Sequence, residues 1–247
     1  MPSFNREAVA FALAGPFALV TASLFFSRLE INTAQLKTLL LTILASVLTF
    51  SILALVGLIN ADVIEFSGAS NLITSANTGP NQVSSVLSLG AFAAFIYAFL
   101  EKEQKFLRFL VIVLGIGLFV QITLTFSRGG LYTLIGAIAM GGFFFMRDQK
   151  ARRSYLLIVL VSFLVFYFLL FPALEQWTSG ALGARLKDTE PTGRIEIIQS
   201  DLEVFMENPV FGIGLGQSNY EHARYFRVSN AHTEYSRLLA EHGVFGA

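Results

Sequence analysis

Long runs without Asp, Glu, Lys or Arg dominate this sequence and constrain its fold more than any other feature. Each run approaches the roughly 20 residues that a helix needs to cross about 30 Å of hydrocarbon, where the backbone must satisfy its own hydrogen bonds. The six runs are 8–26, 39–59, 83–100, 109–126, 131–146 and 154–171. Only 14% of the residues are charged and 54% are hydrophobic, which is unlike an ordinary soluble domain. The sequence therefore predicts an all-α, polytopic transmembrane helical bundle.

The first apolar run is interpreted as a retained helix rather than a cleaved signal peptide. Pro16 lies in its middle, and Ser27-Arg28 follows it where a signal peptide would have a small-residue cleavage site. A series of amphipathic helices in a soluble core is the alternative for all the runs. Their all-round apolar character disfavours that alternative, because a soluble helix keeps one polar face.

Lys and Arg alternate between successive loops, which predicts how the helices are oriented. The first, third and fifth loops each carry two or more of them, the second carries none, and the fourth carries Arg128 alone. Lys and Arg mark the cytoplasmic side of a membrane protein. Residues 60–82, the turn at 127–130 and residues 172–231 are therefore expected on the outer face.

This topology divides the chain into three parts. Residues 1–171 form a six-helix transmembrane region, residues 172–231 a large external loop, and residues 232–247 the start of a further helix that is cut short. The Met1 end would lie outside the membrane, so we expect the chain to be a piece of a longer protein. The loop, at roughly sixty residues, is too long for a passive connection, and long loops commonly carry function.

Within the large loop, the spacing of apolar residues predicts an amphipathic helix from Arg194 to Met206, which Asn208-Pro209 ends. Its apolar stripe consists of Ile195, Ile198, Leu202 and Phe205. Such a helix can lie on the membrane surface or on the bundle. Glycines follow at positions 212, 214 and 216, but a dinucleotide-binding fingerprint would also need a preceding strand, which the pattern does not supply.

Arg128 is a candidate functional residue because of its position at a membrane boundary. It follows an apolar run directly and precedes Gly129-Gly130, which places a guanidinium beside flexible backbone. An interfacial anchor is the alternative role for an Arg at a helix end. The membrane face on which Arg128 is expected favours a functional role. That face is depleted of Lys and Arg, so a lone Arg there does not help to orient the helices.

Arg194 stands at the start of the predicted loop helix, where a cation opposes the helix dipole unless an anion is present. Thr192-Gly193-Arg194 therefore forms a candidate phosphate-binding corner, since helix N-terminal amides and a forked guanidinium both favour phosphate oxygens. A solvated surface Arg is the alternative. Arg185 and Lys187 are expected to be solvated loop charges.

His232 precedes the last predicted helix and is a candidate general base, because a neutral imidazole near pH 7 can accept a proton from a hydroxyl. Glu234 could orient the imidazole or cap the helix, and a structural His is the alternative. A metal site built from His222, His232 and His242 is not expected, since spacings of ten match no ligand pair on a helix face. The chain has no Cys, which excludes disulfides and thiolate chemistry.

Several motifs occur together in a characteristic order. Ser127-Arg128-Gly129-Gly130 follows an apolar helix, and Ala231-His232 leads into a helix with Leu238, Leu239, Glu241 and Gly243. Between them, Gly193-Arg194 opens a helix that ends at Glu207-Asn208-Pro209 and continues into Phe211-Gly212-Ile213-Gly214. From about Thr78 onward, the chain resembles the O-antigen ligase and polymerase superfamily of bacterial envelope polysaccharide enzymes. Asn81 in TGPNQ is similar to its Pro-Asn element, whereas Thr233 stands where members often have Asn after the His.

The resemblance implies a metal-independent glycosyltransferase, without a cofactor, in the bacterial inner membrane. Its donor would be a glycan on undecaprenyl diphosphate, and its acceptor a lipid A core, another glycan repeat unit or a protein. Arg128 and Arg194 would bind the diphosphate together with Asn81, and His232 would accept the proton of the acceptor hydroxyl. Membrane lipid is the expected environment, and no nucleic-acid partner is expected.

Two other functions are compatible with a polytopic protein of this kind. A transporter or flippase of lipid-linked glycan would also need cations near a membrane cavity, but it normally places its polar groups near the bilayer midplane. A non-catalytic scaffold would leave the large loop and Arg128 without a role. The motifs do not distinguish a ligase from a polymerase.

Overall fold

The computed structural model describes residues 6–60, 66, 70–145, 149–188, 194–218 and 234–246. Every element of regular secondary structure in these ranges is a helix, which confirms the predicted all-α fold. The chain divides into two compact units, one of residues Ile31–Thr189 and one that combines Met1–Glu30 with Glu190–Ala247. We call the first the bundle unit and the second the loop unit.

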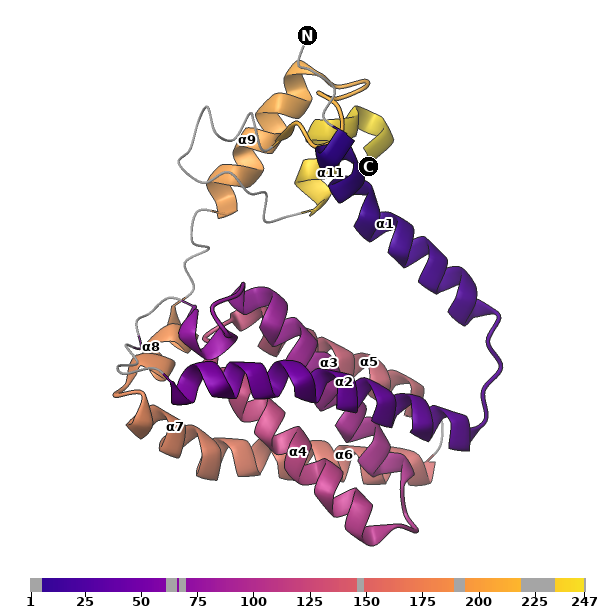
Figure 1. Ribbon diagram of the computed structural model, residues 1–247, viewed down its shortest axis with the longest axis vertical. Helices are drawn as coiled ribbons and strands as arrows, with labels where there is room; N and C mark the ends of the chain where they lie inside the picture. The colour runs from indigo at the N-terminus through magenta and orange to yellow at the C-terminus, as the bar shows by residue number, and fades with distance from the viewer. Residues whose placement is uncertain are drawn as a thin grey trace. The chain divides into compact units, whose positions relative to one another are not determined.

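The bundle unit is built around one central helix. Its long helices are α2 (Thr33–Ile59), α3 (Pro80–Leu100), α4 (Lys105–Leu124), α5 (Arg128–Phe145) and α6 (Gln149–Val165). Helix α3 packs against α2, α4 and α5 (Figure 1). Leu87 of α3 and Leu118 and Ile122 of α4 are among the most buried side chains of the hydrophobic core. At Gly90 a Cβ would overlap Val47, so a glycine is needed where α2 and α3 come closest.

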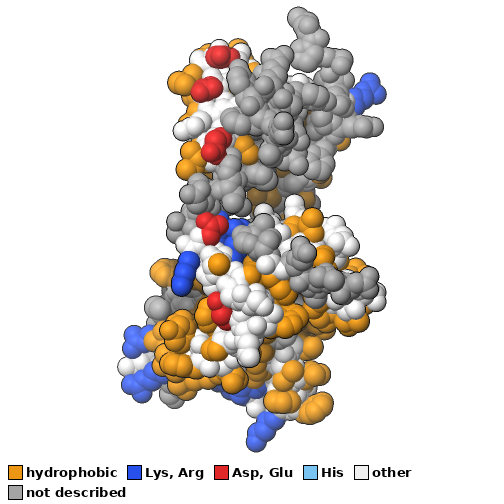
Figure 2. All heavy atoms as spheres, turned by 90° about the vertical axis from the view of Figure 1, so that its left-hand side faces the viewer, with side chains coloured by type: hydrophobic (Ala, Val, Ile, Leu, Met, Phe, Trp, Pro, Cys, Tyr) orange, Lys and Arg blue, Asp and Glu red, His pale blue; other side chains and the backbone are white. Residues whose placement is uncertain are grey.

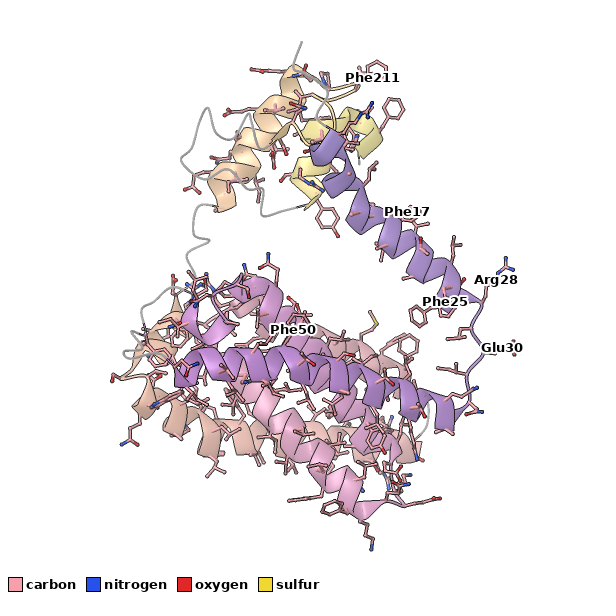
Figure 3. All side chains as sticks on the ribbon, viewed as in Figure 1. Phe17, Phe25, Arg28, Glu30, Phe50 and Phe211 are labelled. Carbon is pink, nitrogen blue, oxygen red and sulfur yellow. The ribbon has the colours of Figure 1, made fainter. Side chains whose placement is uncertain are left out.

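The helices of the bundle unit are suited to a membrane. Four helical segments among the described residues are long and apolar enough to cross one: Thr33–Ile59, Pro80–Leu100, Lys105–Leu124 and Arg152–Trp177. Hydrophobic side chains cover much of the surface drawn in Figure 2. Phe50 on α2, for example, is 49% exposed, as a residue in contact with lipid would be (Figure 3). This is the surface of a polytopic membrane protein, because in water such exposure would favour aggregation.

All the apolar runs in the sequence form helices, but not all of these helices are equally long. Helix α5 has 18 residues, and the described apolar part of α1 (Arg6–Ser27) is Leu13–Ser27. Phe17 and Phe25 project from α1 (Figure 3) and are 74% and 62% exposed. The division of residues 1–171 into six membrane spans stays a prediction.

The last long helix continues beyond the predicted end of the membrane region at Phe171. Helix α6 passes through a π-helical turn, Phe166–Leu170, into α7 (Phe171–Trp177). Pro172 lacks an N–H and would clash with the carbonyl one turn earlier in a regular α-helix. The π turn, with a Phe171 N–H to Phe166 carbonyl bond, accommodates the proline, so the first residues of the predicted loop are helical.

A short helix, α8 (Ala181–Lys187), follows α7 and packs onto the end of the bundle unit. Leu182 of α8 and Leu174 of α7 form a second hydrophobic cluster with Leu124 and Phe126 at the end of α4. Phe66 stacks on Phe126 at a centroid distance of 5.4 Å. Helices α7 and α8 therefore pack against the turn that joins α4 to α5.

The loop unit contains the predicted amphipathic helix, which the structure places at α9 (Arg194–Glu207). Helix α9 packs on α11 (Glu234–His242), and the predicted apolar stripe is only partly buried. Ile195 and Leu202 are 50% and 40% exposed, whereas the buried face consists of Ile197, Ser200, Asp201 and Val204. The sequence did not indicate this buried face, because two of its residues are polar and hydrophobicity alone assigns such residues to the solvent.

The glycine-rich segment after α9 caps the end of α11. The N–H groups of Ile213 and Gly214 donate to the carbonyls of Ala240 and Glu241, each at 3.0 Å. Gly212 has φ +65°, and a Cβ there would overlap the backbone of Glu241. These two N–H groups thus satisfy helix C-terminal carbonyls that would otherwise lack partners. Since a helix and not a strand precedes them, the structure agrees with the rejection of a dinucleotide fingerprint.

Candidate functional site at the α4–α5 turn

The candidate site is built on the tight turn between α4 and α5. Phe126 has φ +56°, a conformation that is uncommon for a bulky residue and persists where its surroundings enforce it. Each carbonyl that the end of α4 exposes receives a donor. Leu124 accepts from the Thr74 hydroxyl at 2.8 Å, and Thr125 accepts from the Asn71 N–H at 2.9 Å. The turn is therefore held on several sides at once.

The carbonyl of Phe126 receives its hydrogen bond from a distant part of the chain. Nε of Arg185, on α8, donates to it at 3.2 Å. Arg185 is only 8% exposed, so the expectation that it is a solvated loop charge was wrong. Lys187 on the same helix is exposed, as expected. Packing of Leu182 into the hydrophobic cluster turns the Arg185 side of α8 toward the turn and causes this burial.

Asn81 lies beside the same turn, at the start of α3. The hydroxyl of Ser127 donates to Asn81 Oδ1 at 2.7 Å, and the hydroxyl of Ser84 donates to Ser127 Oγ at 2.8 Å. One turn further along α3, the Ser88 hydroxyl donates to the carbonyl of Gly130 at 2.8 Å. Asn81 itself is exposed, so the amide of this predicted substrate-binding residue is accessible next to Arg128.

A close approach of two helix backbones makes this network possible. A Cβ at Gly130 would overlap the side chain of Ser84 and press on its backbone. A side chain at this position would therefore separate α5 from α3 and break the serine hydrogen bonds. The sequence indicated Gly129-Gly130 as flexible backbone. In the structure, Gly130 allows the first turn of α5 to pack against α3.

Arg128 is the first residue of α5 and is half-buried. Its Nη1 donates to the backbone carbonyl of Asp188, the residue that ends α8. The carboxylate of Asp188 accepts from Nη1 of Arg185 at 3.0 Å. Two guanidinium groups, from Arg128 and Arg185, therefore meet at one acidic residue. Figure 2 looks onto this end of the bundle unit and shows basic and acidic side chains next to each other there.

This arrangement is suited to binding an anion with several oxygens. Guanidinium groups present forked donors that match phosphate and carboxylate oxygens, and they keep their charge when partly buried. Arg128 and Arg185 both donate to Asp188, Arg128 to its backbone carbonyl and Arg185 to its carboxylate. The site is also at the end of a long apolar helix, where a membrane lipid would place its head group.

Comparison with known proteins identifies the family. The sequence model of the O-antigen ligase family matches residues 112–247, more than half of the chain and all of the site described above except the Asn81 side. The chain belongs to the O-antigen ligase family. Searches of curated proteins and of solved structures found no match.

Membership of the O-antigen ligase family confirms the resemblance seen in the sequence. With its membrane-suited helices, the chain is a multi-pass bacterial membrane protein, and its family is that of ligase and polymerase enzymes acting on glycans. The matched region begins within α4 and contains Arg128, Arg185, Arg194 and His232. The family does not by itself assign roles to these residues.

The other predicted site residues of this O-antigen ligase family chain belong to the loop unit. Arg194 begins α9, but its side chain lies outside the described part of the structure. His232, Thr233 and His222 also lie outside the described residues. The structure thus places Asn81 and Arg128 together, whereas the meeting of Arg128 with Arg194 and His232 stays a prediction.

Buried carboxylates fix the helix that follows His232 to α9 and to the segment after α9. The hydroxyl of Ser236 donates to Asp201 at 2.6 Å, and the hydroxyl of Ser218 donates to Glu241 at 2.7 Å. Asp201 is 0% and Glu241 1% exposed. Buried, hydrogen-bonded carboxylates specify one arrangement of the helices they join. The loop unit therefore holds α11 in a defined position on α9.

In the described ranges, no group of three or more His, Cys, Asp or Glu side chains is arranged to hold a metal ion. Arg185 and the Ser84–Ser127 hydrogen bond were missed by sequence reasoning. The spacing of Leu182 and Arg185 on one face of a short helix, with Asp188 one turn later, is the signal that could have indicated the former.

Proposed function

We propose that this protein transfers or polymerises a glycan carried on undecaprenyl diphosphate, at the outer face of the bacterial inner membrane. The observation that carries the proposal is the position of Arg128, half-buried on a turn that several hydrogen bonds hold in place. Its family supplies the class of reaction, the transfer of glycans by a membrane enzyme. The cationic site supplies the reason for a diphosphate donor.

The chemistry requires positive charge at the leaving group. The acceptor hydroxyl oxygen bonds to the anomeric carbon as the bond from that carbon to the diphosphate oxygen breaks, and the diphosphate leaves with an additional negative charge. Guanidinium groups of Arg128 and Arg194 would stabilise that charge. The proton of the acceptor hydroxyl would pass to the imidazole of His232. We propose that no metal ion is needed, since the arginines provide the charge.

The proposed side of the membrane is supported by the two ends of α4. The helix begins at Lys105, close to Lys102 and Arg108, and Arg128 follows its other end. Twenty residues of α-helix are roughly 30 Å long, which is about the thickness of the hydrocarbon core. Arg128 and the cluster of basic residues are therefore expected at opposite surfaces. Because basic loops stay in the cytoplasm, Arg128 is expected on the periplasmic side.

The acceptor would reach the site from the same side. It would be a growing glycan, a lipid A core or a protein, and the large loop of residues 172–231 is the part of the chain expected to contact it. A transporter of lipid-linked glycan is disfavoured by the position of the cations, because they gather at the end of the helices rather than at mid-membrane.

Transfer of glycan by the purified protein in lipid nanodiscs tests the proposal, with the native lipid-linked glycans of the source bacterium as donor. Arg128→Ala is expected to lower the transfer rate about 10² to 10³-fold, as removal of a charge-stabilising donor does. Arg128→Lys should also lower it, because an ammonium group cannot replace a bidentate fork. His232→Ala should lower it about 10² to 10⁴-fold, as loss of a general base does.

His242→Ala provides the matched control, since this histidine lies in the last turn of α11 and has no proposed role. It should keep the normal rate. Each variant is to be compared at equal amounts of folded protein, so that loss of stability is not counted as loss of activity. Normal transfer by both Arg128→Ala and His232→Ala would refute the proposed function, and inhibition by a chelator would refute metal independence.

A further inference from the structure

We propose that Ser127 is a positioning residue of the donor site, which holds the Asn81 side chain with its amide nitrogen toward the phosphate oxygens of the donor. This role rests on the proposed function, because it takes the donor to be a polyprenyl diphosphate bound beside Arg128. Ser127 had no predicted role of its own beyond its place before Arg128 in the sequence motif.

The two ends of the Asn81 amide have opposite hydrogen-bonding character. Its Oδ1 accepts hydrogen bonds, whereas its Nδ2 donates two of them. The Ser127 hydroxyl lies 2.7 Å from Asn81 Oδ1, a distance that is usual for an O–H···O bond and shorter than most N–H···O bonds. The amide oxygen of Asn81 therefore faces Ser127, and the amide nitrogen faces away from it.

The Ser127 hydroxyl is also held from its other side. Ser84, on α3, donates to Ser127 Oγ at 2.8 Å, which leaves the proton of Ser127 for Asn81. Ser84 and Ser127 are 0% and 2% exposed, so water does not compete for these bonds. The hydrogen bonds thus run in one direction, from Ser84 through Ser127 to Asn81 Oδ1, and they select one orientation of the amide.

The amide nitrogen of Asn81 is accessible to a ligand. Asn81 is exposed, and in the part of the chain that the structure describes its Nδ2 donates to no protein acceptor. The amide lies against the first turn of α5, since a Cβ at Gly129 would be 3.8 Å from Asn81 Oδ1. Nδ2 is therefore available beside the turn that carries Arg128.

A phosphate group distinguishes the two orientations of this amide. Its oxygens are negatively charged acceptors, so they attract Nδ2 and repel Oδ1. Without the Ser127 hydroxyl, the amide could turn over at little cost, because the last torsion of an Asn side chain has broad minima. Oδ1 would then face the phosphate for part of the time. The Ser127 hydrogen bond excludes that orientation before the donor binds, which preserves affinity.

A purely structural Ser127 would behave differently. It would only connect α3 to the turn before α5, and its loss would have the same effect whether or not the Asn81 amide were present. Loss of the hydroxyl leaves Ser84 another acceptor, the backbone carbonyl of Asn81 at 3.0 Å, so no buried donor is left without a partner. The proposed role predicts that the Ser127 hydroxyl affects binding only through the Asn81 amide.

The experiment measures binding of undecaprenyl diphosphate, without a glycan, to the full chain in phosphatidylethanolamine and phosphatidylglycerol nanodiscs. Asn81→Ala should weaken binding about tenfold or more, as loss of a hydrogen bond to a charged group does. Ser127→Ala should weaken it about threefold to tenfold, because the amide remains but is no longer oriented. The double variant should bind within about twofold of Asn81→Ala, since both changes remove the same interaction.

Ser85→Ala is the matched control. The Ser85 hydroxyl, exposed on the same helix, donates to the backbone carbonyl of Asn81 at 2.8 Å and leaves the amide alone, so this variant should bind as the wild type does. Ser127→Thr and Ser127→Val form a second pair, for use where Ser127→Ala does not fold. Their side chains have nearly the same shape, but only Thr keeps the hydroxyl, so Ser127→Thr should bind at least about threefold more tightly than Ser127→Val.

The outcomes separate this role from the proposed function. Normal binding by Arg128→Ala would overturn the proposed function itself. Weak binding by Arg128→Ala with normal binding by Asn81→Ala or Ser127→Ala would overturn only the role of Ser127. Additive losses in the double variant, or equal affinities of Ser127→Thr and Ser127→Val, would show that Ser127 acts through the fold and would also overturn it.

Discussion

The two ends of the bundle unit hold their charges in opposite ways. At the end where α3 meets α4, Nζ of Lys37 lies 2.9 Å from Oε2 of Glu101. The other carboxylate oxygen of Glu101 accepts the N–H groups of Glu103 and Gln104 at 2.9 and 3.0 Å. One cation therefore faces one anion, and the anion is also bonded by the backbone that begins α4. Both oxygens of the Glu101 carboxylate therefore have hydrogen-bond partners within the chain.

At the other end, Arg128 donates to the backbone carbonyl of Asp188, and Arg185 donates to its carboxylate. Asn81 adds an exposed amide there, held by the hydroxyl of Ser127. Two guanidinium groups therefore share Asp188 as a hydrogen-bond partner. We interpret the Glu101 end as stabilising the fold, and we propose that the Arg128 end binds an anion from outside the chain.

Glycines at close contacts between helices provide tests of this comparison. The largest effect is expected at Gly130. Gly130→Ala should separate α5 from α3 at Ser84 and displace Arg128, and it should lower glycan transfer about tenfold or more, since small misplacements in a site are costly. Overpacking should also lower stability by about 1–3 kcal/mol. Transfer rate and thermal unfolding in nanodiscs measure the two effects.

Two other glycines serve as controls for Gly130→Ala. Gly90→Ala overlaps Val47 in the core, away from Arg128, so it should lower stability to a similar extent while folded protein keeps its transfer rate. Gly136→Ala meets open space on α5 and should be neutral or slightly stabilising. Equal losses of transfer in Gly130→Ala and Gly90→Ala would mean that the α3–α5 contact has no special relation to the site.

The contrast between these regions also shows what could be predicted from the sequence. Helices were predictable because each long apolar run determines its own backbone structure in a membrane. Arg128 and Asn81 were found because they adjoin such runs. Arg185 was not, because its burial depends on a contact with Phe126, 59 residues earlier in the chain. Long-range contacts of this kind leave no local pattern.

The buried face of α9 was not predicted, for a related physical reason. Asp201 is buried because Ser236, on another helix, donates to it, and a hydrophobic stripe cannot report a polar partner elsewhere in the sequence. In the predicted stripe, Ile195 and Leu202 are exposed, whereas Ile198 and Phe205 are half-buried. The roles of Arg194 and His232 stay predictions, since the structure does not describe their side chains.

A smaller effect is expected at the Glu101 end, where this carboxylate makes stability depend on pH. Backbone hydrogen bonding from Gln104, followed by the bond from Lys37, lowers the pKa of Glu101 from 4.5 to about 2. A lowered pKa in the folded state stabilises the protein above the unfolded pKa. The stabilisation should therefore be complete above about pH 4.5 and be lost as the pH falls toward 2.

Thermal unfolding of the wild type and Glu101→Gln between pH 2 and pH 7 measures this contribution. The wild type should be the more stable protein at pH 7, and the difference should shrink toward pH 2. Glu103→Gln, which removes an exposed carboxylate two residues away, should leave the wild-type pH profile unchanged. Glycan transfer per folded protein at pH 7 should be normal in Glu101→Gln. A transfer defect there would contradict the assignment of this end to stability alone.

The smallest effect on the protein is expected from single cysteine substitutions, which test whether the two ends of the bundle unit face different compartments. The chain has no Cys, so Lys187→Cys and Lys102→Cys each introduce a single exposed thiol, one at either end of the bundle unit. Neither change should affect folding, because both side chains are exposed and surface substitutions usually alter stability by less than about 0.5 kcal/mol. With the outer membrane permeabilised, a membrane-impermeant maleimide should label position 187, and it should label position 102 only after lysis. If both were labelled equally before lysis, the cationic cluster could not be assigned to the outer face, and the charge asymmetry between the two ends would need an explanation other than a periplasmic donor.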